Sequence, residues 1–203
     1  MAQVSIVDYG IGNTGSIRNM LGRLRVESEL VSEAHGIAAA RRLILPGIGA
    51  FDACMSALRR THLDAPVLEF ARTGRPLLGI CVGMQMLTLD SEEGSLPGLG
   101  LIAAHTRRFP DVEGLRIPHM GWNRIVWRDV NHPLACGLTD EPRFYFVHSY
   151  RVLCDTPQSM LACCSYGGDF AAAVIHENIA GVQFHPEKSH RFGLRLLGNF
   201  AGS

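Results

Sequence analysis

The 203-residue sequence lacks any apolar run close to the ~18 residues that a membrane-spanning helix needs, which argues against an integral membrane protein. It also lacks a net charge, because Lys plus Arg and Asp plus Glu both number 19. A chain with no excess charge has no overall field that attracts nucleic acid or an anionic membrane, so we expect neither as a partner. The N-terminus lacks the regions of a secretory signal peptide, which predicts a cytoplasmic protein.

Zinc-type spacing is absent as well. No C-x-x-C pair occurs among the six cysteines, which are Cys54, Cys81, Cys136, Cys154, Cys163 and Cys164. We therefore expect no metal site, and no other spacing points to an organic cofactor. In a chain without a signal peptide these cysteines should be free thiols, and all except Cys81 are expected to be small core hydrophobes.

With 47% hydrophobic and 19% charged residues, the chain can bury one good core, so we expect a single domain over residues 1–203. Its first half alternates apolar runs with helical patterns, which predicts parallel strands joined by crossover helices. The expected pairs are Val4–Val7 with Ser16–Arg25, Leu43–Leu45 with Phe51–Arg60, and Leu77–Ile80 with Gly83–Leu89.

After Pro97 the pattern changes to short strands with few helical stretches between them. The expected strands are Arg124–Trp127, Phe144–Val147, Met160–Ser165, Phe170–Ile175 and Gly181–Phe184, followed by a helix over Ser189–Phe200. We expect this half to add further sheet, part of it antiparallel. The fold class is therefore α/β, with a mixed, mostly parallel central sheet flanked by helices.

The clearest local signal is Pro76-Leu-Leu-Gly-Ile-Cys-Val-Gly83, an apolar strand that runs through G-x-C-x-G into a helical pattern. This is the cysteine form of a nucleophile elbow, in which flanking glycines permit a sharp turn with the thiol at its tip. The start of the following helix favours the thiolate, which is the attacking species. A lone cysteine is usually structural, but these surroundings favour Cys81 as a nucleophile.

A base for this nucleophile is expected from Phe184-His-Pro-Glu187, at the end of another predicted strand. In an extended segment residues i and i+2 point the same way, so His185 and Glu187 should share a face. A carboxylate behind an imidazole fixes its tautomer and stabilises the imidazolium, as in a catalytic triad. The sequence thus predicts a Cys81–His185–Glu187 triad.

A third strand end carries Pro46-Gly47-Ile48-Gly49, whose glycines leave backbone N–H groups free to face a ligand. Together with the N–H of Val82, Gly47, Ile48 and Gly49 could form an oxyanion hole. A fourth segment, Gly10-Ile-Gly-Asn-Thr-Gly15, matches the G-x-G-x-x-G pattern of a dinucleotide site. Asp8 would place a carboxylate near the pyrophosphate, so we interpret this segment as a partner-facing loop and not a cofactor site.

These motifs, in this order, resemble the class I glutamine amidotransferases, which have a flavodoxin-like fold, and the resemblance covers almost the whole chain. Within that family the similarity is to glutaminase subunits of imidazole glycerol phosphate synthases, of histidine biosynthesis. It rests on Asp8–Asn13, Pro118–Asn123, Tyr145–Tyr150 and Phe184–Ser189.

The resemblance implies that Cys81 attacks the side-chain amide of glutamine and that His185 protonates the departing ammonia. It also implies a set of glutamine-binding residues: Gly49, Gln85, Glu93, His148, Ser149 and Tyr150. The Glu93 carboxylate is a suitable partner for the amino group of glutamine. By composition alone, Gln85 and Glu93 would be taken as ordinary helix surface.

The family further implies a heterodimer with a (β/α)₈ barrel cyclase subunit, because ammonia in water is mostly ammonium and must be transferred without contact with solvent. Residues near His119–Asn123 would lie close to that junction. Lys188–Gly193 and Asn13–Ser16 are closer to duplicate subunits linked to surface-polysaccharide synthesis, so a sugar is an alternative acceptor. A pyridoxal phosphate synthase partner fits the motifs less well, and a non-enzymatic scaffold is disfavoured by the complete triad.

Overall fold

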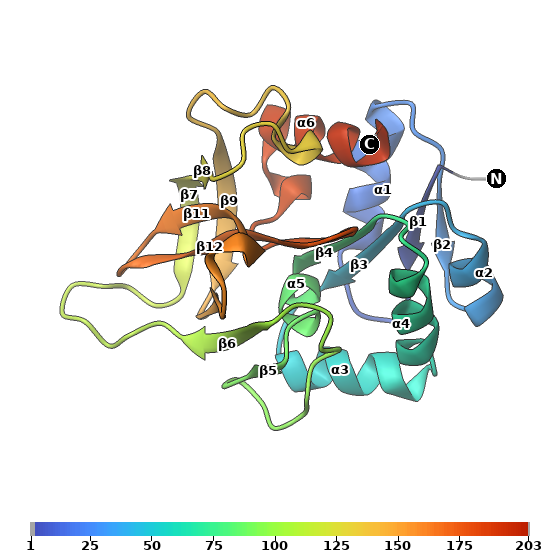
Figure 1. Ribbon diagram of the computed structural model, residues 1–203, viewed down its shortest axis with the longest axis horizontal. Helices are drawn as coiled ribbons and strands as arrows, with labels where there is room; N and C mark the ends of the chain where they lie inside the picture. The colour runs from blue at the N-terminus through green and yellow to red at the C-terminus, as the bar shows by residue number, and fades with distance from the viewer. Residues whose placement is uncertain (1–2, 203) are drawn as a thin grey trace.

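The computed structural model describes residues 3–202, and residues 1, 2 and 203 of the expected domain lie outside this range. One sheet of 11 strands dominates the molecule, and helices cover both of its faces (Figure 1). The path of the sheet follows the order β2-β1-β3-β4-β13-β12-β10-β6-β5, with β11 and β8 attached beyond β12. Strands β7 and β9 form a separate two-stranded ribbon.

The first half supplies the parallel part of the sheet. Its strands are β1 (Val4–Val7), β2 (Ser28–Val31), β3 (Leu43–Gly47) and β4 (Leu77–Cys81), and β13 (Ile179–Val182) joins β4 from the far end of the chain. Strands β1, β3, β4 and β13 are buried throughout, as expected for a parallel sheet covered on both faces. Because parallel strands end at the same edge, β3 and β4 bring Gly47 opposite Cys81.

The helices differ in the face they cover. Helix α1 (Thr14–Arg23) packs with α6 (His190–Gly202) on one face, and α3 (Phe51–Arg60), α4 (Asp64–Arg72) and α5 (Val82–Met86) lie on the other, where α2 (Ala34–Ala39) contacts α4 (Figure 1). Within residues 3–202 no helix combines the length and the apolar character needed to cross a bilayer.

The second half adds mainly antiparallel strands, as expected. They are β6 (Ala104–Arg108), β7 (His119–Arg124), β8 (Val126–Trp127), β9 (Arg143–His148), β10 (Tyr150–Cys154), β11 (Met160–Ser165) and β12 (Asp169–His176), while β5 (Asp90–Ser91) pairs parallel with β6. The expected strand over Arg124–Trp127 is interrupted at Ile125, which separates β7 from β8. Short 3₁₀ turns occur at Pro133–Ala135, Pro157–Ser159 and Pro186–Lys188.

The structure corrects part of the cysteine prediction. All six thiols are free, and Cys54 and Cys164 are buried as expected. Cys136 is exposed directly after the 3₁₀ turn over Pro133–Ala135, and Cys154, at the end of β10, and Cys163, in β11, are only partly buried. These three are therefore not small core hydrophobes.

Candidate active site

Cys81 occupies the sharp turn between β4 and α5, with φ 56° and ψ −115°. A positive φ costs a non-glycine residue about 1–3 kcal/mol, and such strain is typical of a nucleophile elbow. Both flanking glycines are required by close contacts. A Cβ on Gly83 would lie 2.0 Å from the Leu45 carbonyl oxygen, and one on Gly79 would lie 2.7 Å from the Gly83 oxygen. The G-x-C-x-G pattern thus reflects tight packing of β3, β4 and α5 around the cysteine.

His185 and Glu187 form a buried pair, in which Nδ1 of the imidazole lies 2.8 Å from Oε1 of the carboxylate. The predicted pairing is present, but it is not made on an extended segment, because the strand, β13, already ends at Val182. A 3₁₀ turn over Pro186–Lys188 folds Glu187 back onto His185. Ser189 holds this turn: its hydroxyl donates to the His185 carbonyl (2.6 Å) and accepts the Tyr145 N–H (3.0 Å).

The protonated form of His185 is favoured. Burial lowers the pKa of this imidazole, but interactions with Cys81 and Glu187 outweigh burial and raise the pKa to about 10. Since Nδ1 is occupied by Glu187, Nε2 is the ring nitrogen left for the sulfur, and within residues 3–202 it has no hydrogen-bond partner. The pair can therefore hold a proton next to Cys81 and deliver it from Nε2.

The Pro46–Gly49 loop follows β3 directly beside the nucleophile. Two buried donors hold its carbonyl groups: the Tyr9 hydroxyl donates to the Pro46 oxygen (2.7 Å), and the Cys54 thiol donates to the Ile48 oxygen (3.2 Å). Burial raises the pKa of both donors, so both remain protonated at neutral pH. Gly49 has φ 81°, a conformation that favours glycine.

A cavity of about 410 Å³ opens beside Cys81 and His185. Its lining includes every residue expected to contact glutamine: Gly49, Gln85, Glu93, His148, Ser149 and Tyr150. Ile48 and Val82 of the expected oxyanion hole also line it, whereas the buried Gly47 does not. A cavity of this size suits a small ligand, and residues from distant parts of the chain converge on it.

Besides its expected contact with the amino group of glutamine, Glu93 has a contact within the protein that the sequence did not suggest. Its Oε2 accepts the backbone N–H of Phe51 at the start of α3 (2.9 Å), and burial raises the pKa of the carboxyl group. Gln85 donates to the side-chain oxygen of Gln183 (3.0 Å), whose own amide nitrogen lies 4.0 Å from the Cys81 sulfur. Gln85 is buried, and Glu93 is partly buried in a turn after β5, so neither is ordinary helix surface.

The G-x-G-x-x-G segment lies next to the triad. Its Asn13 donates through Nδ2 to Oε1 of Glu187 at 3.4 Å, and α1 begins at the next residue. The segment thus contacts the carboxylate of the triad, an arrangement that differs from a nucleotide-binding turn, where the loop faces a ligand. Its expected orientation toward a partner stays a prediction.

Several residues of the site were not identified from the sequence. Gln183, Asn13 and Ser189 contact triad residues, and Lys188, Pro118 and Val147 line the cavity. The signal for Gln183, Lys188 and Ser189 was their position within or beside the Phe184–Glu187 motif. Asn13 lies in the Gly10–Gly15 segment, but nothing local indicated its contact with Glu187, which is 174 positions away.

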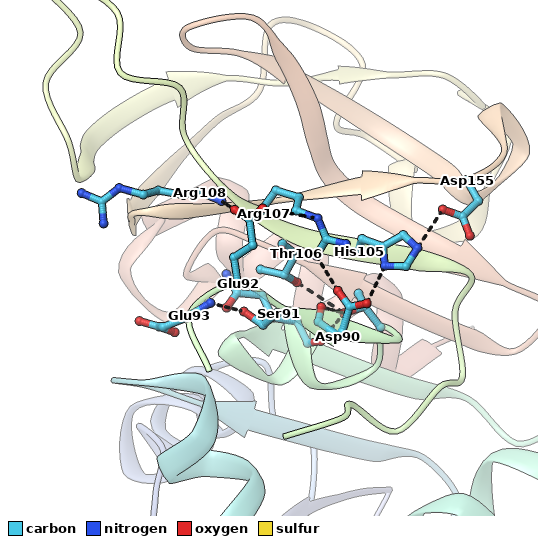
Figure 2. Close-up of polar contacts among 11 residues, drawn as sticks. Asp90, Ser91, Glu92, Glu93, His105, Thr106, Arg107, Arg108 and Asp155 are labelled. Carbon is cyan, nitrogen blue, oxygen red and sulfur yellow. Dashed lines mark hydrogen bonds and ion pairs between the residues drawn. The ribbon is translucent and has the colours of Figure 1, made fainter. Parts of the chain in front are cut away.

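A polar cluster at the sheet edge lies next to Glu93 in sequence, but its role is to connect two strands and not to line the cavity. Figure 2 shows His105 between two carboxylates, with Nδ1 2.8 Å from Asp90 and Nε2 3.5 Å from Asp155. Arg107 also binds Asp90, and this contact, followed by the His105 hydrogen bond, lowers the pKa of the aspartate. These side chains are partly exposed and fasten β5 to β6.

Comparison with known proteins identifies the family of this chain. The family model for class-I glutamine amidotransferases matches residues 5–201. Imidazole glycerol phosphate synthase subunit HisH 2 of Pseudomonas aeruginosa is 44% identical over 97% of this chain and 98% of its own length. The protein of the same name from Methanococcus maripaludis is also 44% identical, with the same coverage. Subunit HisH of Bdellovibrio bacteriovorus is 44% identical over 98% of both chains.

Solved structures show the same fold at low identity. A crystal structure of a glutamine amidotransferase superposes with a TM-score of 0.76 at 20% identity, over 98% of this chain and 99% of the other. The structure of PurLQS from Thermotoga maritima gives 0.74 at 16% identity, over 98% and 97%. With a matching family model over nearly the whole chain, this protein belongs to the class I glutamine amidotransferases.

Proposed function

We propose that the chain is the glutaminase subunit of an imidazole glycerol phosphate synthase and supplies ammonia for histidine biosynthesis. The observation that carries the proposal is the cavity in which Cys81 and His185 meet all six expected glutamine-contact residues. The names of relatives about 44% identical over nearly the full chain support the synthase assignment.

In the proposed reaction the sulfur of Cys81 attacks the carboxamide carbon of glutamine. The N–H groups of Ile48, Gly49 and Val82, the members of the expected oxyanion hole that line the cavity, stabilise the resulting oxyanion, a contribution typically worth about 2.7–4 kcal/mol per donor. As the C–N bond breaks, His185 gives its proton to the departing nitrogen, and ammonia and a glutamyl thioester form. Water then attacks the thioester while His185 accepts its proton, and the sulfur leaves as a thiolate, which releases glutamate and restores the thiolate beside a protonated His185.

Glutamine recognition is assigned to the remaining residues of the cavity. The Glu93 carboxylate would pair with the α-ammonium group of glutamine while it keeps the Phe51 N–H. Ser149 and Tyr150, at the turn between β9 and β10, would bind the α-carboxylate of glutamine through their backbone groups. Lys188 also lines the cavity and supplies a positive charge for the α-carboxylate.

The ammonia must be passed on without contact with water, because the ammonium ion has no lone pair for attack. The partner we propose is a cyclase subunit with a (β/α)₈ barrel, docked over the mouth of the cavity. Exposed apolar side chains support the assignment: Ile48, which lines the cavity, is 43% exposed, and Trp122 and Met120, on β7 directly after the cavity-lining Pro118, are 47% and 62% exposed. Such side chains are suited to burial against a partner.

The test measures glutamate release by the chain alone, then with a cyclase subunit of an imidazole glycerol phosphate synthase and the nucleotide substrate of that subunit. We expect low activity alone and a large increase in the ternary mixture. Cys81→Ala should abolish the increase, and Cys136→Ser, which changes an exposed thiol, should not. Labelling of Cys81 by a glutamine-analogue electrophile without the increase would keep the glutaminase chemistry and indicate a sugar-modifying partner. Labelling no faster than Cys136 would contradict both.

A further inference from the structure

The Pro118–Asn123 motif contains a histidine to which the proposed mechanism gives no role. His119 lies directly opposite His148 in the antiparallel β7–β9 ribbon, and its Nδ1 is 3.0 Å from Nε2 of His148. Both rings are buried, with 3% and 7% exposure. His119 is also stacked between Phe146 (4.7 Å) and Tyr166 (4.0 Å), so the plane of its ring is fixed.

The hydrogen bonds of these two rings form a chain with one direction. Nδ1 of His148 lies 2.7 Å from the carbonyl oxygen of Tyr150, which can only accept, so this nitrogen carries the proton. In a neutral imidazole the other nitrogen is then an acceptor. Nε2 of His148 must therefore receive its hydrogen bond from Nδ1–H of His119.

The hydrogen bond on the other side of His119 agrees with this direction. Nε2 of His119 is left as an acceptor and lies 3.3 Å from the amide nitrogen of Asn123. The orientation of that amide is independently fixed, because its oxygen accepts the Arg124 N–H (2.8 Å) and its nitrogen donates to the Ser165 carbonyl (3.2 Å). Every donor in the chain has one acceptor, and a proton added to either ring would set two donors against each other.

The surroundings favour the neutral state of both rings. Burial lowers the pKa of His119 to about 4 and that of His148 to about 3, in the latter case against the hydrogen bond to Tyr150. At neutral pH each ring therefore has a proton on only one of its nitrogens, and the hydrogen bonds described above require that nitrogen to be Nδ1.

The series of hydrogen bonds that links the two rings ends in the cavity wall. The Tyr150 carbonyl, which His148 holds, also accepts from Nε2 of Gln85 at 3.4 Å. The adjacent Ser149 carbonyl accepts the Phe109 N–H (3.1 Å), so the Ser149–Tyr150 turn is held from both sides. We propose that His119 is a positioning residue that fixes the tautomer of His148 and thereby the Ser149–Tyr150 turn of the glutamine site. The inference rests on the glutaminase function proposed above.

The first test reads the tautomers directly, in the isolated ¹⁵N-labelled chain, by long-range ¹H–¹⁵N correlation at pH 7.5. We expect both rings to be neutral with the proton on Nδ1. The signals are assigned from the spectra of His119→Asn and His119→Gln. An Nε2–H tautomer or a charged ring at either position would overturn the proposal.

The second test uses the same two variants as a matched pair, in the assembled complex. The amide of asparagine takes the place of Nδ1 and can donate to His148, whereas the amide of glutamine takes the place of Nε2 and meets only Asn123. Both variants lose the stacking with Phe146 and Tyr166, so a merely structural role would affect them equally.

We expect His119→Gln to raise the KM for glutamine about tenfold, the effect of losing one buried hydrogen bond, with kcat within about threefold. His119→Asn should keep KM within about threefold of the original and keep the His148 proton on Nδ1. Equal increases of KM in both variants would overturn the proposal. If the unmodified complex released no glutamate, the proposed function would fail, and the spectra of the isolated chain would still decide the inference.

Discussion

Two buried histidine pairs each contribute one ring to the cavity wall, His185 and His148, and they differ in what they do with a proton. In the first, His185 lies 2.8 Å from the Glu187 carboxylate, and in the second, His119 lies 3.0 Å from the His148 ring. Distance and burial are similar. Yet the pKa of His185 is raised to about 10, whereas the pKa values of His119 and His148 fall to about 4 and about 3.

The difference comes from the charge of the partner. Burial alone disfavours the charged form of any imidazole, which explains the low pKa values of His119 and His148. At His185 the sulfur of Cys81 and the carboxylate of Glu187 compensate for burial, so a proton is retained. One pair can therefore exchange protons with a substrate, and the other can only orient its neighbours.

Replacing the charge of the first pair by a neutral group should produce the largest effect. Glu187→Gln keeps the shape of the partner and a hydrogen bond, but it can favour the wrong tautomer of His185 and no longer stabilises the imidazolium. We expect kcat for glutamate release to fall about 10³–10⁴-fold, the scale known for the corresponding change in a serine triad. Glu113→Gln, at an exposed carboxylate, is the control and should leave kcat unchanged. A loss of less than about tenfold would show that the charge of Glu187 does not govern His185.

The second pair should make the free energy of unfolding depend on pH. An unfolded histidine titrates near 6.5, so between pH 6.5 and about 4 the unfolded chain binds a proton that folded His119 does not. Stability should therefore be lost as pH falls through this window, by on the order of 2–3 kcal/mol for His119. His185 has the opposite sign: its contribution is present below pH 6.5 and is lost as pH rises toward about 10.

The measurement is urea unfolding at pH 4.5, 5.5 and 7 for the original chain and for His119→Asn, which has no titrating group at this position. Between pH 7 and 4.5 we expect the variant to lose less stability, and acidic groups common to both proteins cancel in the comparison. His35→Asn, at an exposed ring, is the control and should reproduce the original slope. Parallel slopes for all three proteins would contradict a neutral His119 in the folded state.

The first pair was predictable from the sequence and the second was not, for a physical reason. His185 and Glu187 are two positions apart, so any compact turn can bring them together, although the turn is 3₁₀ and not the extended strand expected. His119 and His148 are 29 positions apart, and they meet only because of the register of β7 on β9. Registers of this kind depend on tertiary packing, for which the local sequence has no signal.

The elements of the fold likewise differ in whether the local sequence predicts them. The buried strands β1, β3 and β4 have continuous apolar runs and were predicted within two residues of their ends. Strand β2 is half exposed and β5 has only two residues, so neither shows a pattern. Helix α4 was missed although Pro66 lies in its first turn, where proline is tolerated.

The smallest effect is expected at a third histidine pair, His105 with Asp90, which has the same 2.8 Å contact with a carboxylate as the triad but lies at the sheet edge (Figure 2). The side chains of His105 and Asp90 are 34% and 44% exposed, against 4% and 1% for His185 and Glu187. Exposed ion pairs contribute about 0–1 kcal/mol, because water already solvates both groups. His105→Gln should therefore lower the free energy of unfolding by less than about 1 kcal/mol.

In the same variant kcat and KM for glutamine should stay within about twofold of the original values, because Arg107 still holds Asp90 and β5 keeps its pairing with β6. Urea unfolding and steady-state glutaminase assays of the complex provide the two measurements. A loss of activity comparable to that of Glu187→Gln would mean that contact distance, and not burial, determines what a histidine–carboxylate pair contributes. The expected contrast, at one distance and between an imidazole and a carboxylate in both pairs, points to desolvation as the property that makes the triad pair strong.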